Sequence, residues 1–389
     1  MSHFVEDLLS LKDGVPNSIT DLARVIKNQE IPENERKRLV RWFLEMKARE
    51  RAIPMRVAFE LTPLCNLDCK MCYVHLQSNK FDKQSLVPLD VWRDIAVQAY
   101  LLGTRTITLT GGECLTYPGF EDLYLYLYQS GFSISIMSNG VLMDSHRVSF
   151  FCKYKPRFIQ ISLYGSSEDT YEAVTGSRVF NRVYQNLINI RDAGIKLQIS
   201  ITPNRYMTHD MESLIRLAES LHVPYEINCR LIRPRANTGR SSEDMTLDEY
   251  VRIYKIRSKL SNNFVPIPYD PSELPMENAT GIASKGLLCG AGSSSCAITY
   301  EGNMVPCVSL SDYSVSVLKL GFAEAWRQIH VYAMNYPLPS ECNGCVYSSI
   351  CIRCQAQHQN APRGHCDRQI CKRTKKLAAA GFYHYEPHQ

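Results

Sequence analysis

The chain has 389 residues and a formal net charge of +5, with 45% hydrophobic and 21% charged residues, which is ordinary for a soluble globular protein. No stretch is long and apolar enough to cross a membrane, the acidic residues near the start argue against a signal peptide, and no block of Lys and Arg favours nucleic acid. We therefore expect a cytoplasmic protein without membrane or nucleic-acid partners, whose thiols stay reduced.

Residues 1–52 are predicted to be helical, and from there strand and helix signals alternate along the chain. Strands are expected at 54–62, 104–113, 132–140, 157–165, 196–204 and 225–234. Helices are expected at 120–131, 183–195, 211–223 and 246–260. Repeated β–α units predict a parallel sheet, and six strands are fewer than the eight of a complete barrel.

The last third of the chain has a different composition. Residues 265–281 are rich in proline and read as a bridging segment. A Cys-rich region begins near residue 286, and the sequence EGN predicts a hairpin turn within 296–307.

Fifteen cysteines are present, and their clustering favours metal ligation over disulfides. The stretch LCNLDCKMCY holds Cys65, Cys69 and Cys72 in a C-x3-C-x2-C spacing, directly after the first predicted strand. Three thiolates suit an iron–sulfur cluster whose fourth iron stays open to another ligand. Zinc, with His75 as the fourth ligand, is the alternative.

This spacing, with aromatic Tyr73 after the last cysteine, resembles the signature of radical S-adenosylmethionine (SAM) enzymes. Three further stretches resemble that family's motifs over about residues 57–240. They are TGGE with Gly111, Gly112 and Glu113; MSNG with Ser138 and Asn139; and QISLYG with Ser162.

The resemblance implies a partial (β/α)6 TIM-like barrel in which Cys65, Cys69 and Cys72 hold a [4Fe-4S] cluster. The open iron would chelate SAM, and reductive cleavage would give a 5'-deoxyadenosyl radical that takes a hydrogen atom from the substrate. The glycines would permit close backbone approach and Glu113 would receive the methionine ammonium. The remaining SAM contacts implied are Tyr73 at the adenine, Ser138 and Asn139 at the ribose, and Ser162.

Two further residues near these motifs have two interpretations each. Arg178 could pair with the SAM carboxylate or be a solvated loop arginine. Cys114, which follows Glu113, could donate a hydrogen atom to a substrate radical, as an epimerase requires. A packing role for Cys114 is favoured, because free cysteines are usually buried as small hydrophobic residues.

Nine cysteines lie between residues 289 and 371, enough for two four-ligand sites. Alone, such spacing fits zinc ribbons as well as iron–sulfur clusters. After a radical SAM core, it resembles a SPASM domain with two auxiliary [4Fe-4S] clusters. The implied ligands are Cys289, Cys296, Cys307 and Cys354 for cluster I, and Cys342, Cys345, Cys351 and either Cys366 or Cys371, with Cys371 favoured, for cluster II.

The expected segments are a helical region (1–55), a radical SAM core (56–240), a bridging helix and linker (241–285), a SPASM domain (286–380) and a tail (381–389). The expected function is oxidative modification of a ribosomally made peptide through a thioether or carbon–carbon cross-link. Sulfatase maturation by formylglycine formation, peptide epimerisation and a small-molecule substrate remain alternatives, and a zinc-ribbon nucleic-acid binder is the non-enzymatic rival.

The resemblance also implies a reductant such as flavodoxin or ferredoxin. The sequence before the core does not read as a winged helix, so we expect either a separate leader-peptide-binding protein or a substrate without a leader. Formylglycine formation is disfavoured because Val308, and not a carboxylate, follows Cys307, although Asp312 is near.

Overall fold

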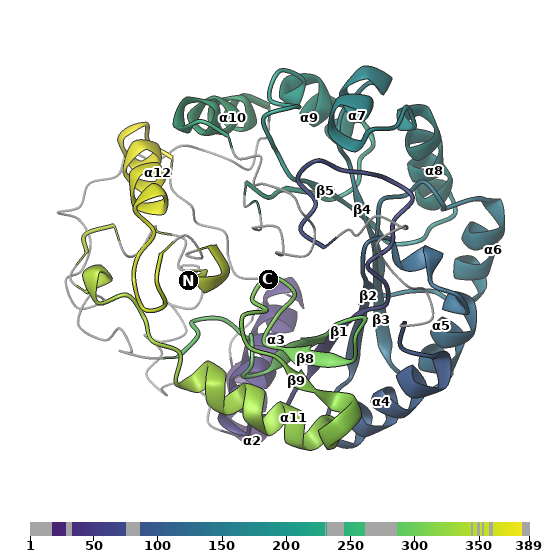
Figure 1. The fold of residues 1–389 in the computed structure, drawn as a ribbon, viewed down its shortest axis with the longest axis vertical. Helices are drawn as coiled ribbons and strands as arrows, with labels where there is room; N and C mark the ends of the chain where they lie inside the picture. Colours follow the sequence, from purple (N-terminus) through teal and green to yellow (C-terminus); the bar gives the residue numbers. More distant parts are fainter. Residues whose placement is uncertain are drawn as a thin grey trace.

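The computed structural model describes residues 18–28, 33–74, 86–229, 231, 245–260, 286–343, 345–347, 351, 354–357 and 361–382 (Figure 1). The proline-rich segment 265–281 and His75 lie outside the described residues. No helix in the described ranges combines the length and apolar character needed to cross a membrane.

Six parallel strands confirm the predicted alternation of strands and helices. They are β1 (Arg56–Glu60), β2 (Thr106–Thr110), β3 (Ser133–Ser138), β4 (Phe158–Ser162), β5 (Leu197–Ile201) and β6 (Tyr225–Ile227). Each pairs with the next in chain order. Phe59, Leu109, Ile136 and Ile159 form one register row across four strands, and all four are fully buried. A continuous row of large apolar side chains explains why these strands stay in register.

Helices lie along the outside of the curved sheet in Figure 1. They are α4 (Leu89–Leu101), α5 (Phe120–Gln129), α6 (Ser145–Lys153), α7 (Glu168–Thr175), α8 (Phe180–Asp192), α9 (Met211–Ser220) and α10 (Leu247–Leu260). Helices α4, α6 and α7 were not predicted. Capping side chains mark the start of two of them, since Asp144 accepts from Arg147 N and Ser167 accepts from Thr170 N.

The Cys-rich region extends the same sheet. Strand β7 (Ser295–Ile298) pairs in parallel with β1, and β8 (Asn303–Val305) and β9 (Val315–Ser316) follow in antiparallel pairing. The strand order is β6-β5-β4-β3-β2-β1-β7-β8-β9. The hairpin around EGN is confirmed, whereas the pairing of β7 with β1 was not predicted. The α/β fold with a parallel, partial-barrel sheet is thus as expected.

The remaining helices precede the sheet or follow its later strands in the chain. Helices α2 (Ile19–Asn28) and α3 (Glu33–Glu50) precede β1, α11 (Val317–Met334) packs beside α4, and α12 (Arg368–Ala379) packs against α10 (Figure 1). Short 3-10 turns occur at η3 (Cys114–Thr116), η7 (Ser340–Cys342) and η8 (Gln355–Gln357). Arg373 of α12 donates to the Tyr250 hydroxyl of α10 at 3.1 Å, which ties the Cys-rich region to α10.

Candidate active site

The first three cysteines lie in the loop after β1, at the carboxyl edge of the sheet. Cys69 is buried, and Cys65 and Cys72 are partly buried. The loop is held to the end of α7, because the Asp68 and Lys70 amides donate to backbone carbonyls there at 3.0 and 2.9 Å. The fold therefore places all three thiols beside the active edge of the parallel strands.

Tyr164, two residues beyond β4, lies near the three thiols of this loop. Burial raises the pKa of its hydroxyl, and negative charge on Cys69, Cys72 and Cys65 raises it further. Ser162, the last residue of β4, lies near this hydroxyl and opposes the rise in its pKa. Tyr164, a residue that the sequence did not single out, therefore lies between Ser162 and the cysteine loop.

The two glycines of TGGE pack against the backbone of the cysteine loop. Gly111 has φ +151°, and a Cβ there would lie 2.5 Å from the Thr62 carbonyl oxygen. A Cβ on Gly112 would lie 2.4 Å from the Leu64 carbonyl oxygen. The Gly112 amide donates to Thr62 O at 2.7 Å. Glycine is needed here because any side chain would separate the loops after β1 and β2.

Glu113 is fully buried and accepts hydrogen bonds from two loops. Its carboxylate accepts from the Asn139 amide at 2.7 Å, from the Ser138 hydroxyl at 3.0 and 3.1 Å, and from the Leu115 amide at 3.2 Å. Burial raises the pKa of Glu113, and these hydrogen bonds oppose that shift. A cationic ligand group would compensate the buried carboxylate directly.

Asn139 joins Glu113 to the cysteine loop. Its side-chain Nδ2 lies 3.4 Å from Cys65 Sγ and donates to Asn66 Oδ1 at 2.9 Å. Its Oδ1 accepts from the Val141 amide at 3.0 Å. Hydrogen-bonded contacts therefore run without interruption from Glu113 through Asn139 to Cys65, connecting the loops after β1, β2 and β3.

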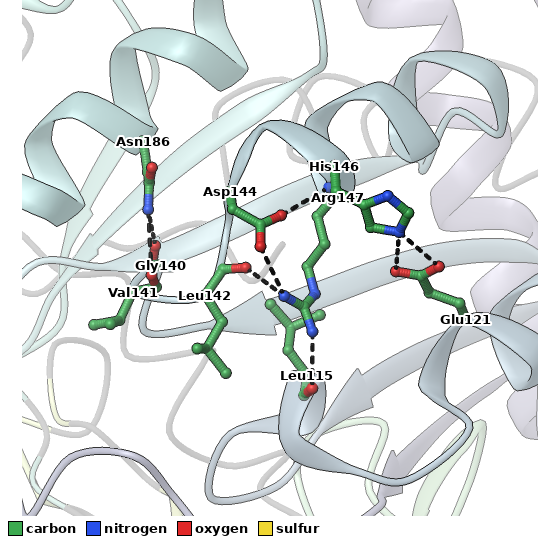
Figure 2. A network of polar contacts seen from close by, with 9 residues as sticks. All are labelled: Leu115, Glu121, Gly140, Val141, Leu142, Asp144, His146, Arg147 and Asn186. Carbon is green, nitrogen blue, oxygen red and sulfur yellow. Dashed lines mark hydrogen bonds and ion pairs between the residues drawn. The ribbon is translucent and has the colours of Figure 1, made fainter.

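Two residues that sequence reasoning missed hold these loops in place (Figure 2). Arg147 of α6 donates to Leu142 O at 2.9 Å and to Leu115 O at 3.4 Å, bridging the loops after β3 and β2. Buried Asn186 of α8 donates to Gly140 O at 2.8 Å. An amide on the buried face of a predicted helix was the available sequence signal for Asn186, because such a group needs a polar partner.

Three predicted site residues have other surroundings. Tyr73 is partly buried and packs against the main core. Arg178 forms ion pairs with Asp169 at 2.7 Å and Glu172 at 2.9 Å on an exposed surface. Cys114 is fully buried, and its thiol donates to Met137 O at 3.3 Å. Their roles toward SAM or substrate stay predictions.

The later cysteines separate into two groups. In the first, burial, together with the charges of Cys354 and Cys289, raises the pKa of Cys307 to about 12, so both of those thiols lie near Cys307. Cys296 lies on β7 beside Val57 and packs in the main core. Among the described residues its pKa is raised by burial, with no contribution from another cysteine.

The second group contains five thiols for four expected positions. Burial raises the pKa of both Cys342 and Cys351. The charges of Cys371 and Cys345 raise both pKa values further, and contact with Cys366 opposes the shift of Cys342. The sulfur atoms of Cys366 and Cys371 are 3.1 Å apart. Both candidates for the last ligand of cluster II therefore reach the same place.

The donor sets fit iron–sulfur clusters in kind, since each group presents three or more thiols near one another. Within the described residues, no three His, Cys, Asp or Glu side chains are arranged to hold a single metal ion. Cys65, Cys69 and Cys72 are the residues that would hold the first cluster. Glu113 and Asn139 would then face a ligand bound beside it.

Part of the chain matches a known family model. Residues 59–218 match the model of the Radical SAM superfamily. An AdoMet-dependent heme synthase of Nitratidesulfovibrio vulgaris is 24% identical over 346 residues, covering 81% of this chain and 91% of that protein. The subtilosin biosynthesis protein AlbA of Bacillus subtilis is 21% identical over 377 residues, covering 91% and 79%.

Solved structures with the same fold include SuiB of Streptococcus suis, with a TM-score of 0.60 and 15% identity over 91% of this chain and 86% of SuiB. Another is anSMEcpe with bound AdoMet, with a TM-score of 0.64 and 16% identity over 84% of this chain and 97% of that one. SuiB has also been solved bound to its precursor peptide SuiA, and anSMEcpe with a Cp18Cys peptide.

Proposed function

The chain is an enzyme of the radical SAM superfamily, its radical SAM domain spanning residues 59–218, and from that premise we propose that it modifies a peptide oxidatively. When bound, SAM and a [4Fe-4S] cluster on Cys65, Cys69 and Cys72 supply the radical that removes a hydrogen atom from the substrate. The product we propose is a thioether or carbon–carbon cross-link in a ribosomally made peptide. The reaction takes place in the cytoplasm, and a flavodoxin or ferredoxin supplies its electrons.

One observation carries the SAM-binding part of the proposal: the unbroken contacts from Glu113 through Asn139 to Cys65. They bring a buried carboxylate next to the loop that bears the three thiols. Glu113 is positioned to accept a ligand ammonium group, and Asn139 to orient the loop around it. Gly111 and Gly112 keep the two loops close enough for one ligand to touch both.

The peptide substrate is supported by two of the similar proteins. The structure of SuiB with a precursor peptide and the assignment of AlbA to subtilosin biosynthesis both concern peptides. This chain covers most of the length of each. Closing a cross-link removes two hydrogens, one as an atom and one as a proton plus an electron. Auxiliary clusters on the two C-terminal thiol groups would accept that electron.

The alternatives make different demands on the same residues. Formylglycine formation asks for a base near Cys307, and Asp312 accepts from the Tyr332 hydroxyl and pairs with Arg363 at 2.7 Å. Epimerisation asks for a thiol facing the substrate, and the Cys114 thiol is fully buried against Met137 O. These contacts favour the cross-linking proposal over both.

Mass spectrometry of a co-expressed peptide tests the proposal. The chain is expressed with the product of any short open reading frame beside its gene, with Cys69→Ala as the matched control. We expect peptide that has lost two hydrogens per modification only with the unaltered chain. Modification of a sulfatase Cys to formylglycine, or conversion of a porphyrin with no change in the peptide, would reject the peptide cross-linking proposal.

A further inference from the structure

A cavity of about 630 Å³ lies at the amino edge of the sheet, opposite the candidate active site. Its walls include Arg56, the first residue of β1, Thr106, the first residue of β2, and Arg157, directly before β4. Helix α3 forms another wall. The strands are five residues long, so about 17 Å of strand separates this cavity from the cysteine edge.

The cavity is lined by five cationic and two acidic side chains. Both carboxylates are already paired: Glu33 with Lys37 at 2.6 Å, and Glu45 with Arg56 at 2.9 Å. Glu45 also accepts a hydrogen bond from the hydroxyl of Ser294, so this carboxylate already has its partners within the protein.

Arg36, Arg41 and Arg157 remain without a carboxylate partner among the described residues. Of these three arginines, half-buried Arg157 says most about what the cavity can bind. Its pKa is lowered first by burial and then by the positive charges of Arg41 and Arg56. Like charges gathered around a cavity repel one another, and a bound anion would relieve that repulsion.

The rest of the lining indicates the size and character of that anion. Val40, Leu44 and Met55 add an apolar wall. The volume is within the range of about 300–1,000 Å³ typical of small-molecule sites and far exceeds a bare inorganic anion. The ligand therefore needs a strongly anionic head for the arginines and an apolar body for this wall.

We propose that this cavity binds the phosphate monoester of a small molecule. A phosphate monoester carries close to two negative charges and three acceptor oxygens at neutral pH, which suits adjacent unpaired guanidinium groups. Arginine also binds phosphate oxygens in a two-pronged geometry that lysine lacks. The site lies apart from the SAM-binding edge and does not depend on the peptide-modifying reaction.

Isothermal titration of the full-length, cluster-reconstituted protein tests the proposal, with phenyl phosphate, inorganic phosphate and benzoate as probes at constant ionic strength. We expect phenyl phosphate to bind more tightly than inorganic phosphate because of the apolar wall, and benzoate to bind most weakly. Arg157→Met and Arg41→Met should each weaken phenyl phosphate binding by about tenfold or more, as expected for loss of a charge-assisted hydrogen bond.

Arg216→Met is the matched control, because Arg216 is an exposed arginine of α9 paired with Glu212 away from the cavity. Arg41 is exposed on α3, so Arg41→Met should retain the fold, and unchanged iron content and circular dichroism verify this. No phenyl phosphate binding at millimolar concentration, equal binding by all variants, or tighter binding of a glutamate-rich peptide would overturn the proposal. Each result is obtained without SAM or turnover, so it is separate from the fate of the peptide proposal.

Discussion

At the scale of single residues, the site depends on a few polar side chains that join loops. The motifs around Cys65, Glu113 and Asn139 were each visible in the sequence. Their mutual contacts were not, because hydrogen bonds between loops more than 25 residues apart leave no local pattern. Arg147 was not predicted either, because an arginine in a helix three residues after Asp144 looks like one half of an ordinary surface ion pair.

Replacing Arg147 with methionine should weaken SAM binding by about tenfold, or ~1.4 kcal/mol, because the loops after β2 and β3 lose their shared donor. Equilibrium dialysis of the reconstituted protein measures this effect. The neighbouring His146→Gln is the control, because exposed His146 contacts only Glu121 among the residues of Figure 2. Equal affinities in the two variants would contradict a positioning role for Arg147.

At the scale of elements, the core strands were predictable because apolar, β-branched runs alternate with turn residues. Helices α4, α6 and α7 escaped prediction, although caps such as Asp144 and Ser167 were present to be read. The pairing of β7 with β1 could not be foreseen. These strands lie about 240 residues apart, and a short apolar strand carries no information about its partner.

Tyr117, which follows η3, anchors the loop after β2, and its replacement tests that role. Its hydroxyl donates to Val87 O at 2.7 Å, and burial raises its pKa to about 12. Tyr117→Phe should lower the free energy of unfolding by about 1 kcal/mol below pH 10, the usual net value of one hydrogen bond.

The pH dependence of this effect has a definite sign. Between about pH 10, where tyrosine ionises in the unfolded chain, and about pH 12, the folded chain keeps a proton that the unfolded chain loses. Stability from Tyr117 therefore falls as pH rises through this window, and the phenylalanine variant should show a shallower decline. Urea unfolding of the metal-free chain measures both effects, with Tyr128→Phe as an exposed control. Parallel curves for all three chains would refute the anchoring role.

At the scale of the whole molecule, most of the cysteines form three groups. Spacing along the chain predicted the first group, whereas the division of the later cysteines was implied by the resemblance to a SPASM domain. The sequence could not choose between Cys366 and Cys371, and the fold brings both to one place, with sulfur atoms 3.1 Å apart. Cys296 is the member whose proposed ligand role is least supported by its surroundings, since it lies in the main core.

Counting the iron atoms in two single variants shows which of Cys366 and Cys371 is a cluster ligand. The charge of Cys371 raises the pKa of both Cys342 and Cys351, so Cys371 lies near both thiols. We therefore expect Cys371→Ala to lose one cluster, about four iron atoms, and Cys366→Ala to retain the full complement. The reverse pattern would assign the ligand to Cys366. Full iron in both variants would mean that either thiol can substitute for the other.

The central claim is that Cys65, Cys69 and Cys72 hold the cluster at which SAM is cleaved. The most direct measurement is the yield of 5'-deoxyadenosine from anaerobically reconstituted, reduced protein and SAM. We expect steady production by the unaltered chain with about 12 iron atoms, none by Cys69→Ala, and partial retention by Cys345→Ala. Undiminished 5'-deoxyadenosine from Cys69→Ala, or purified protein that contains zinc without sulfide, would contradict the account.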